Sequence, residues 1–142
     1  MIVKEFMTKD IEVISPDSTV KDAAGKMKSL NVGMLPVCDG EKLKGVITDR
    51  DIVVKAIAEG KDPNATEVQN IISEDMRICF DDEGVEEAAK RMKTKQIRRL
   101  PVLSRNKRLV GVVSLGDIAV RVNEELAGDV LEKVSEPSKP EK

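Results

Sequence analysis

The sequence predicts an α/β protein made of two β-α-β-β-α repeats, related by a pseudo-twofold axis and packed sheet to sheet. Displacing the sequence by 65 residues aligns Ala23-Ala24 with Ala88-Ala89, and self-similarity at a fixed spacing marks a repeat architecture. The octet GVITDRDI at residues 45–52 also returns as GVVSLGDI at residues 111–118. With 142 residues, 40% of them hydrophobic, the chain can bury a core as one domain or two small ones.

Each repeat is expected to open with an extended run, at residues 11–14 and 76–80. A helix follows in each copy, because apolar residues recur on one face at helical spacing. In the first copy these residues are Val20, Ala23, Ala24, Met27 and Leu30.

A hairpin and a second helix complete each repeat. In the first copy, strands at 34–38 and 43–48 flank the polar turn Asp39-Gly40-Glu41, which is a hairpin signal. The second helix is expected over residues 49–59, with Gly60 closing it in the left-handed conformation. Its predicted buried positions are Ile52, Val53, Ala56 and Ile57.

The predicted organisation is repeat 1 at residues 1–60, a linker at 61–66, repeat 2 at 67–122, and an acidic C-terminal helix with a disordered tail at 123–142. The linker is rich in turn-forming residues. A three-stranded sheet with two helices leaves one apolar face uncovered, so the two copies should pack together. The C-terminal helix offers an apolar stripe that could dock on a neighbour, formed by Leu126, Val130, Leu131 and Val134.

Composition excludes several function classes. The net charge is -2, which gives no general attraction to nucleic acid or anionic lipid. We predict a cytoplasmic protein, because no stretch approaches the ~20 apolar residues that cross a membrane. Cys38 and Cys79, without any histidine, complete neither a zinc site nor a disulfide framework. The lack of a histidine base also argues against an enzyme.

The doubled octet suits a nucleoside phosphate. Thr48 with Asp51, and Ser114 with Asp117, fit the form of a helix capping box. Such a box prefers Glu or Gln where both copies carry the shorter Asp, which favours a second role. Free N–H groups at a helix start attract phosphate, and an Asp can accept hydrogen bonds from ribose hydroxyls.

The repeated pattern G-h-h-[TS]-x-x-D, preceded each time by L-P-V and by an Ala-Ala-x-x-Met helix, resembles a tandem pair of CBS domains, also called a Bateman module. The resemblance covers residues 1 to about 122. The ending at Gly116-Asp117-Ile118-Ala119 and the acidic helix resemble small stand-alone bacterial and archaeal members. The resemblance implies a regulatory module that binds AMP, ADP, ATP or S-adenosylmethionine between the repeats, requires no cofactor, forms a homodimer and signals to an unknown target protein.

The resemblance also implies the ligand-binding residues. Those expected at ribose and phosphate are Asp51, Asp117, Thr48, Ser114, Arg50, Arg98 and Arg99. Those expected beside adenine are Ile11, Glu12, Val13, Met76, Arg77 and Ile78. Repeat 1 lacks the pair Arg98-Arg99 and repeat 2 lacks a counterpart of Arg50, so we expect two unequal sites.

Two other interpretations stay open. In the first, the repeats form a ligand-independent platform for dimerisation or protein interaction, and the octets serve only capping and packing. In the second, residues 90–108, with nine Lys or Arg and no acid, bind nucleic acid. We consider nucleic acid the weaker alternative, because with two Phe and no Tyr or Trp we expect no exposed aromatic residues on which single strands could stack.

Overall fold

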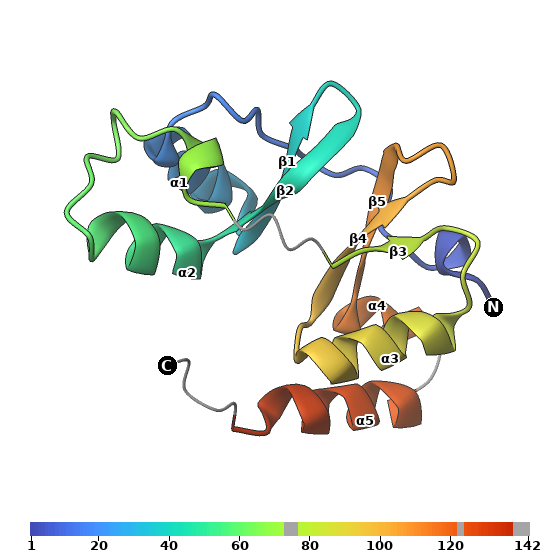
Figure 1. Ribbon diagram of the computed structural model, residues 1–142. Helices are drawn as coiled ribbons and strands as arrows, with labels where there is room; N and C mark the ends of the chain where they lie inside the picture. The colour runs from blue at the N-terminus through green and yellow to red at the C-terminus, as the bar shows by residue number, and fades with distance from the viewer. Residues whose placement is uncertain (73–76, 122–123, 138–142) are drawn as a thin grey trace. The chain divides into compact units, whose positions relative to one another are not determined.

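The computed structural model describes residues 1–72, 77–121 and 124–137 (Figure 1). The chain forms two compact units. The first-repeat unit is Glu12–Met76. The second-repeat unit joins Met1–Ile11 to the chain from Arg77 onward. The predicted packing of one repeat on the other, and the predicted domain boundaries, stay predictions.

The first-repeat unit is a helix, a hairpin and a second helix, in the predicted order. Its elements are α1 (Val20–Leu30), β1 (Met34–Asp39), β2 (Lys42–Thr48), α2 (Asp49–Asp51), the π-helix η2 (Ile52–Ile57) and the 3-10 helix η3 (Val68–Asn70). β1 and β2 pair antiparallel. Gly40 turns the chain between them with a φ of +61°, a conformation that glycine adopts at no steric cost. The predicted hairpin is confirmed.

The second-repeat unit repeats this order and adds a short strand, β3, and a C-terminal helix, α5. Its elements are the 3-10 helix η1 (Val3–Glu5), β3 (Cys79–Phe80), α3 (Val85–Lys95), β4 (Arg99–Leu103), β5 (Leu109–Ser114), α4 (Leu115–Arg121) and α5 (Glu124–Ser135). β4 lies between β3, to which it is parallel, and β5, to which it is antiparallel. The predicted mixed α/β architecture with two small sheets is confirmed.

The long helices α1 and α3 form where apolar periodicity and helix ends predict them. Val20, Ala23 and Met27 of α1 are buried and belong to the core of the first-repeat unit. The prediction was wrong for Ala24 and Leu30, which are exposed. The apolar stripe on α1 is therefore narrower than the periodicity suggested.

The extended runs predicted at residues 11–14 and 76–80 are mostly not strands. In the first copy only Ile14 bridges to Val37; in the second copy the strand is the two-residue β3. The Ile14 amide donates to the Pro36 carbonyl of β1 and the Ile14 carbonyl accepts from the Cys38 amide. The adjacent Val13 carbonyl accepts from the Lys26 Nζ at 2.6 Å.

The second helix of the first repeat is wound differently from the prediction. Residues Ile52–Ile57 form a π-helix, which has more residues per turn than an α-helix. Ile52 and Ala56 pack in the core of the first-repeat unit, while Val53 and Ile57 are 59% and 55% exposed. Their predicted burial was wrong.

The first eleven residues pack with the second repeat rather than with the first. Phe6 is 1% exposed in the core of the second-repeat unit, beside Val3 and Met7. Thr8 and Val112 exchange two backbone hydrogen bonds, of 2.9 and 3.0 Å. Gly111 permits this approach, because a Cβ there would lie 2.7 Å from the Thr8 carbonyl oxygen.

The opening segment of the second repeat makes the equivalent contacts in the first-repeat unit. The Val3 amide donates to the Glu83 carbonyl at 2.8 Å, and the Val68 amide donates to the Ser18 carbonyl at the same distance. Val68 and Ile71 are buried in the core of the first-repeat unit. Since each pair is related by the 65-residue repeat, each copy opens with a segment that completes the other copy's core.

The C-terminal helix docks on its own repeat. α5 packs against α3 and α4 (Figure 1), with Val130 fully buried and Leu126 and Val134 packed against the same core. Leu131, which was predicted as part of the apolar stripe of this helix, is 47% exposed. The predicted disordered tail lies mainly at 138–142, outside the described residues.

Candidate functional site

The octet of the first repeat folds into the predicted capping box. The Thr48 hydroxyl, at the end of β2, accepts from the Asp51 amide at 3.0 Å, and the Asp51 Oδ2 accepts from the Thr48 amide at 2.9 Å. The other oxygen, Asp51 Oδ1, lies 3.2 Å from the Nζ of Lys55, a side chain that is 41% exposed. One carboxylate oxygen is therefore fixed by the backbone, and the other faces a cation that a ligand could displace.

The octet of the second repeat forms the same box. The Asp117 amide donates to the Ser114 Oγ at 3.0 Å, and the Ser114 amide donates to Asp117 Oδ2 at 2.9 Å. The remaining Asp117 Oδ1 lies 3.5 Å from the hydroxyl of Thr8, which comes from the N-terminal segment. Thr8 therefore adds a hydroxyl to this site.

The short Asp side chain gives no evidence for a second role by itself. In both octets it completes the reciprocal box that we expected to need Glu or Gln. The same box forms at the start of α1, where Asp22 and Thr19 exchange two hydrogen bonds of 3.1 Å. Our inference from the length of Asp was wrong, because Asp spans the distance in all three boxes.

The predicted cations lie beside these boxes. In the second-repeat unit, Arg99 pairs with Ser114 across the hairpin, and the Arg98 carbonyl accepts from the Leu115 amide at 2.8 Å. Both arginines are exposed. In the first-repeat unit, Met34 takes the place opposite Thr48, and the exposed Arg50 lies within the first helical turn. Each box thus has a cation next to it, from a different element in each copy.

The residues expected beside adenine belong to different units of the chain. Ile11 belongs to the second-repeat unit, whereas Glu12 and Val13 belong to the first. Arg77 is exposed and Ile78 is half-buried just before β3, and Met76 lies outside the described residues. The structure therefore does not test this part of the site.

The sequence analysis did not identify a basic residue that recurs in both copies and binds the backbone of the segments expected beside adenine. Lys26 of α1 and Arg91 of α3 are equivalent in the repeat. The Lys26 Nζ donates to the Val13 carbonyl at 2.6 Å and the Arg91 Nη1 donates to the Ile78 carbonyl at 3.1 Å. The sequence contained a sign of this contact, because a basic residue recurs at the same position of the repeat in both copies.

The second repeat adds a carboxylate to this arrangement. The guanidinium of Arg91 donates two hydrogen bonds of 2.7 Å to Glu83, whose side chain is 12% exposed. Burial alone would raise the pKa of the Glu83 carboxyl, but hydrogen bonds from Arg91 and from the Phe80 amide, with the charge of Arg91, lower the pKa overall. The pair is therefore charged at neutral pH.

Replacing Arg91 by methionine should lower the free energy of unfolding by about 2 kcal/mol at pH 7, because it leaves a largely buried carboxylate with one backbone donor. A carboxyl with a lowered folded-state pKa stabilises the fold above its unfolded pKa of about 4.3 and loses this effect as the pH falls through its folded pKa. Wild-type and variant stabilities, measured by urea denaturation, should converge below about pH 4. Arg91→Lys is the control and should fall between them, while a gap that is constant with pH would contradict a role for the charge.

The two cysteines lie apart from these boxes. Both are buried and free. Burial raises the pKa of Cys38, and burial with the Glu83 charge raises that of Cys79 to about 12. Both are therefore protonated and unreactive thiols at neutral pH.

A surface groove of about 760 Å³ runs beside α1, along Ser18, Lys21 and Lys26. None of the predicted ligand residues lines it. Within residues 1–72, 77–121 and 124–137, no group of three His, Cys, Asp or Glu is placed to hold a metal ion. Over the same residues, the structure contains no helix long and apolar enough to span a membrane.

These features define a class, a two-copy α/β module with one capped strand-to-helix turn in each copy. The CBS domain family model matches residues 3–57 and 68–124, so the chain belongs to the CBS domain family and carries two copies of the domain. It is 40% identical over 134 residues to the CBS domain-containing protein YhcV of Bacillus subtilis, covering 94% of each chain.

Solved structures of CBS proteins share the fold. Hypoxic Response Protein I with two coordinated zinc ions has a TM-score of 0.80 at 32% identity, over 87% of this chain and all of that one. The CBS domain pair of MJ0100, in complex with 5-methylthioadenosine and S-adenosylmethionine, has a TM-score of 0.74 at 29% identity, over 84% and 93%. CBSX2 in complex with AMP has a TM-score of 0.73 at 26% identity, over 83% and 93%.

Proposed function

We propose that this chain is a regulatory, non-catalytic module that binds an adenosine-containing ligand at its two octets. The observation that carries the proposal is the duplicated box in which one oxygen of Asp51 and of Asp117 is fixed by the backbone. Within the described residues, the second oxygen of each contacts the Lys55 or the Thr8 side chain, which a ligand could displace. A carboxylate held in this way can accept hydrogen bonds from a pair of ribose hydroxyls.

Three further features support the proposal. Arg50 and the Arg98-Arg99 pair add exposed positive charge beside the boxes, where a phosphate would lie. Two similar CBS proteins are known with AMP or with S-adenosylmethionine and 5-methylthioadenosine. The arginines differ between the copies, so we expect one site to bind a phosphate-bearing ligand more tightly than the other.

A ligand-independent interaction module is the second candidate, and one observation favours it. Both boxes are complete without a ligand, and the same box forms at Thr19 and Asp22, outside the octets. Capping alone therefore suffices to explain the Thr, Ser and Asp residues. A homodimer is compatible with either function, and the signalling target is unknown in both.

Ligand-induced stabilisation distinguishes the two functions. A ligand at a hundred times its dissociation constant adds about 2.7 kcal/mol to the stability of the folded state, which should raise the melting temperature by roughly 5–15 °C. We expect this shift in a thermal denaturation panel with at least one of AMP, ADP, ATP and S-adenosylmethionine, and no shift with GTP, the control. Equal melting temperatures with all five at millimolar concentration would favour the interaction module.

A further inference from the structure

In the second repeat, the carboxylate of Glu83 occupies a small polar site between α3 and the segment that precedes it. Its Oε1 accepts from the Phe80 amide at 2.8 Å. Both carboxylate oxygens accept from the guanidinium of Arg91, each at 2.7 Å, and the same guanidinium donates to the Ile78 carbonyl at 3.1 Å. A backbone amide and a cation fixed on a backbone carbonyl therefore form a binding site for a carboxylate, which the second repeat fills with its own side chain.

The first repeat has the same backbone turn at this place. The Ser18 amide donates to the Ser15 carbonyl at 3.1 Å. In the second repeat the Glu83 amide donates to the Phe80 carbonyl at the same distance. Since each pair is related by the 65-residue repeat, the Ser15 amide takes the place of the Phe80 amide. Within the described residues, the Ser15 amide donates to no acceptor.

The cation of the site is also retained, but the carboxylate is not. Lys26 takes the place of Arg91, and its Nζ donates to the Val13 carbonyl as Arg91 donates to its counterpart. Ser18 takes the place of Glu83, and a serine side chain ends one atom beyond Cβ. The first repeat therefore keeps the donors of the carboxylate site without the side chain that fills it.

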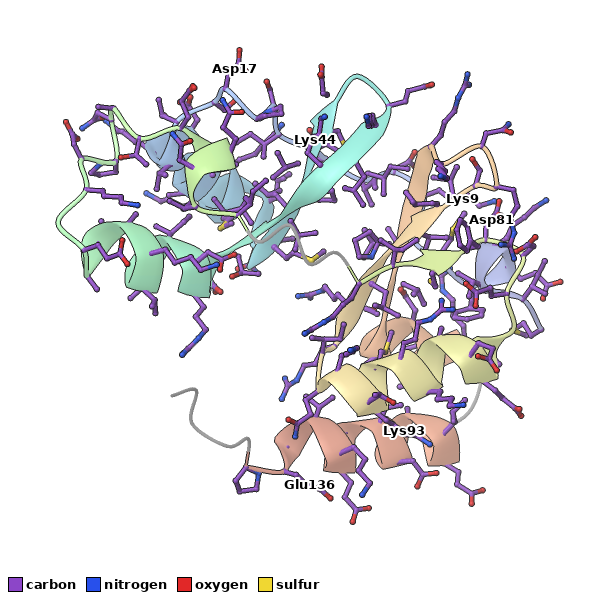
Figure 2. The ribbon with its side chains drawn as sticks, in the orientation of Figure 1. Lys9, Asp17, Lys44, Asp81, Lys93 and Glu136 are labelled. Atoms are coloured by element: carbon purple, nitrogen blue, oxygen red, sulfur yellow. The ribbon has the colours of Figure 1, made fainter. Side chains whose placement is uncertain are left out.

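The acidic side chains near Lys26 leave room for another carboxylate. The Glu12 Oε2 lies 3.3 Å from the Lys26 Nζ on a side chain that is 59% exposed, and an ammonium has three donors. The Val13 carbonyl and Glu12 use two of them. Asp22 is held in the capping box of α1, and Figure 2 shows the Asp17 side chain directed away from α1.

This site opens into the groove of about 760 Å³ beside α1, because Ser18 and Lys26 both line the groove. Gly25 lines it too, in the interior of α1 where α3 has Lys90. Glycine weakens a helix interior, and a Cβ at Gly25 would meet nothing within 4 Å, so packing does not require it. The buried Ile14 and the exposed Asn64 complete an apolar and a polar contact. A groove of this volume can accommodate a small molecule.

We propose that this groove binds a small organic carboxylate, whose carboxylate group takes the position that the Glu83 carboxylate has in the second repeat. The group accepts hydrogen bonds from the Ser15 amide and the Lys26 Nζ. The rest of the molecule lies along Ile14 and Gly25. None of the octet residues lines the groove, so the proposal does not depend on nucleotide binding.

Propionate is a direct probe, because it is the side chain of glutamate without the backbone. It is titrated into the isotope-labelled full chain, with sodium propionate replacing sodium chloride so that the ionic strength stays constant. We expect saturable amide shifts at residues 13–18 and 25–26, with a dissociation constant of about 1–20 mM. Propionamide, the uncharged isostere, should bind at least about tenfold more weakly, because hydrogen bonds to a charged acceptor are stronger.

Protein variants locate the site. Ser18→Glu supplies the carboxylate from the chain itself, as in the second repeat, and should abolish propionate binding. It should also raise the melting temperature at pH 7 above that of Ser18→Gln, which has the same shape without the charge. Lys26→Met should abolish binding, while Lys21→Met, which removes another cation of the same groove, is the matched control and should weaken binding by no more than about twofold.

The reverse substitution tests the comparison between the copies. Glu83→Ser opens the equivalent site beside Arg91, so propionate should bind there and raise the melting temperature of this variant more than that of the wild type. Three results would overturn the proposal: no saturable shift up to about 100 mM propionate, equal binding of propionamide, or propionate binding that Ser18→Glu leaves intact.

Discussion

Replacing Phe6 by alanine is expected to lower the free energy of unfolding by about 3–5 kcal/mol, the cost of removing a buried aromatic side chain. Phe6 is 1% exposed and lies in the core of the second-repeat unit, next to Val3 and Met7. It belongs to the opening segment of the first copy in sequence, and it contributes to the core of the second-repeat unit because the two copies exchange these segments. The midpoint of urea denaturation should fall accordingly, with little change in slope.

The exposed residue Lys4 in the same segment provides the control. Lys4→Ala should change stability by no more than about 0.5 kcal/mol. Hydrogen exchange of Phe6→Ala should show lost protection at Val112, whose amide donates to the Thr8 carbonyl. If Phe6→Ala cost less than about 1 kcal/mol, well below the range for buried aromatics, the N-terminal segment would not be part of this core.

Asp51→Ala and Asp117→Ala are each expected to weaken nucleotide binding at their own site by roughly tenfold to a hundredfold. This range corresponds to the 1.5–3 kcal/mol of a hydrogen bond to a charged group. Each substitution also removes a capping box, which costs about 0.5–2 kcal/mol of stability. Isothermal titration with the ligand selected by the thermal panel measures the affinity, and urea denaturation measures the stability.

The third box separates the two effects. Asp22→Ala removes the equivalent box at the start of α1, so it should cost a similar stability while nucleotide affinity stays at the wild-type value. Asp51→Glu is a second comparison, because glutamate can also form the capping box but carries its carboxylate one methylene further from the backbone. If Asp51→Ala, Asp117→Ala and Asp22→Ala bind nucleotide equally well, the octets are caps and the assignment of the site is wrong.

Much of the fold could be predicted because it depends on local pattern. The hairpin between β1 and β2, the helices α1 and α3 and both capped turns follow from turn residues, apolar spacing and Thr or Ser before Asp. The errors came where tertiary contacts override such patterns. Val53 and Ile57 are exposed because Ile52 and Ala56 fill the core side of η2 instead, and the first extended run forms only the bridge of Ile14 to Val37.

For the candidate site, the sequence indicated the residues of each box and the cations beside them. It did not indicate the hydrogen bond between Thr8 and Asp117, or the hydrogen-bonded ion pair between Arg91 and Glu83. Thr8 is more than a hundred residues from Asp117 in sequence, and no periodicity records such a contact.

The sequence by itself determined that the chain folds as two copies of one unit, since equal apolar patterns form equal helices and strands. Only the tertiary structure decided which opening segment completes which copy. The segments at Val3–Glu5 and Val68–Asn70 carry similar apolar residues that could fit either core, and chain connectivity and packing make the choice. The tertiary structure likewise decided that α5 covers the second repeat and leaves the equivalent face of the first repeat exposed. The apolar stripe of an amphipathic helix shows that the helix packs on another surface, but it does not show on which one.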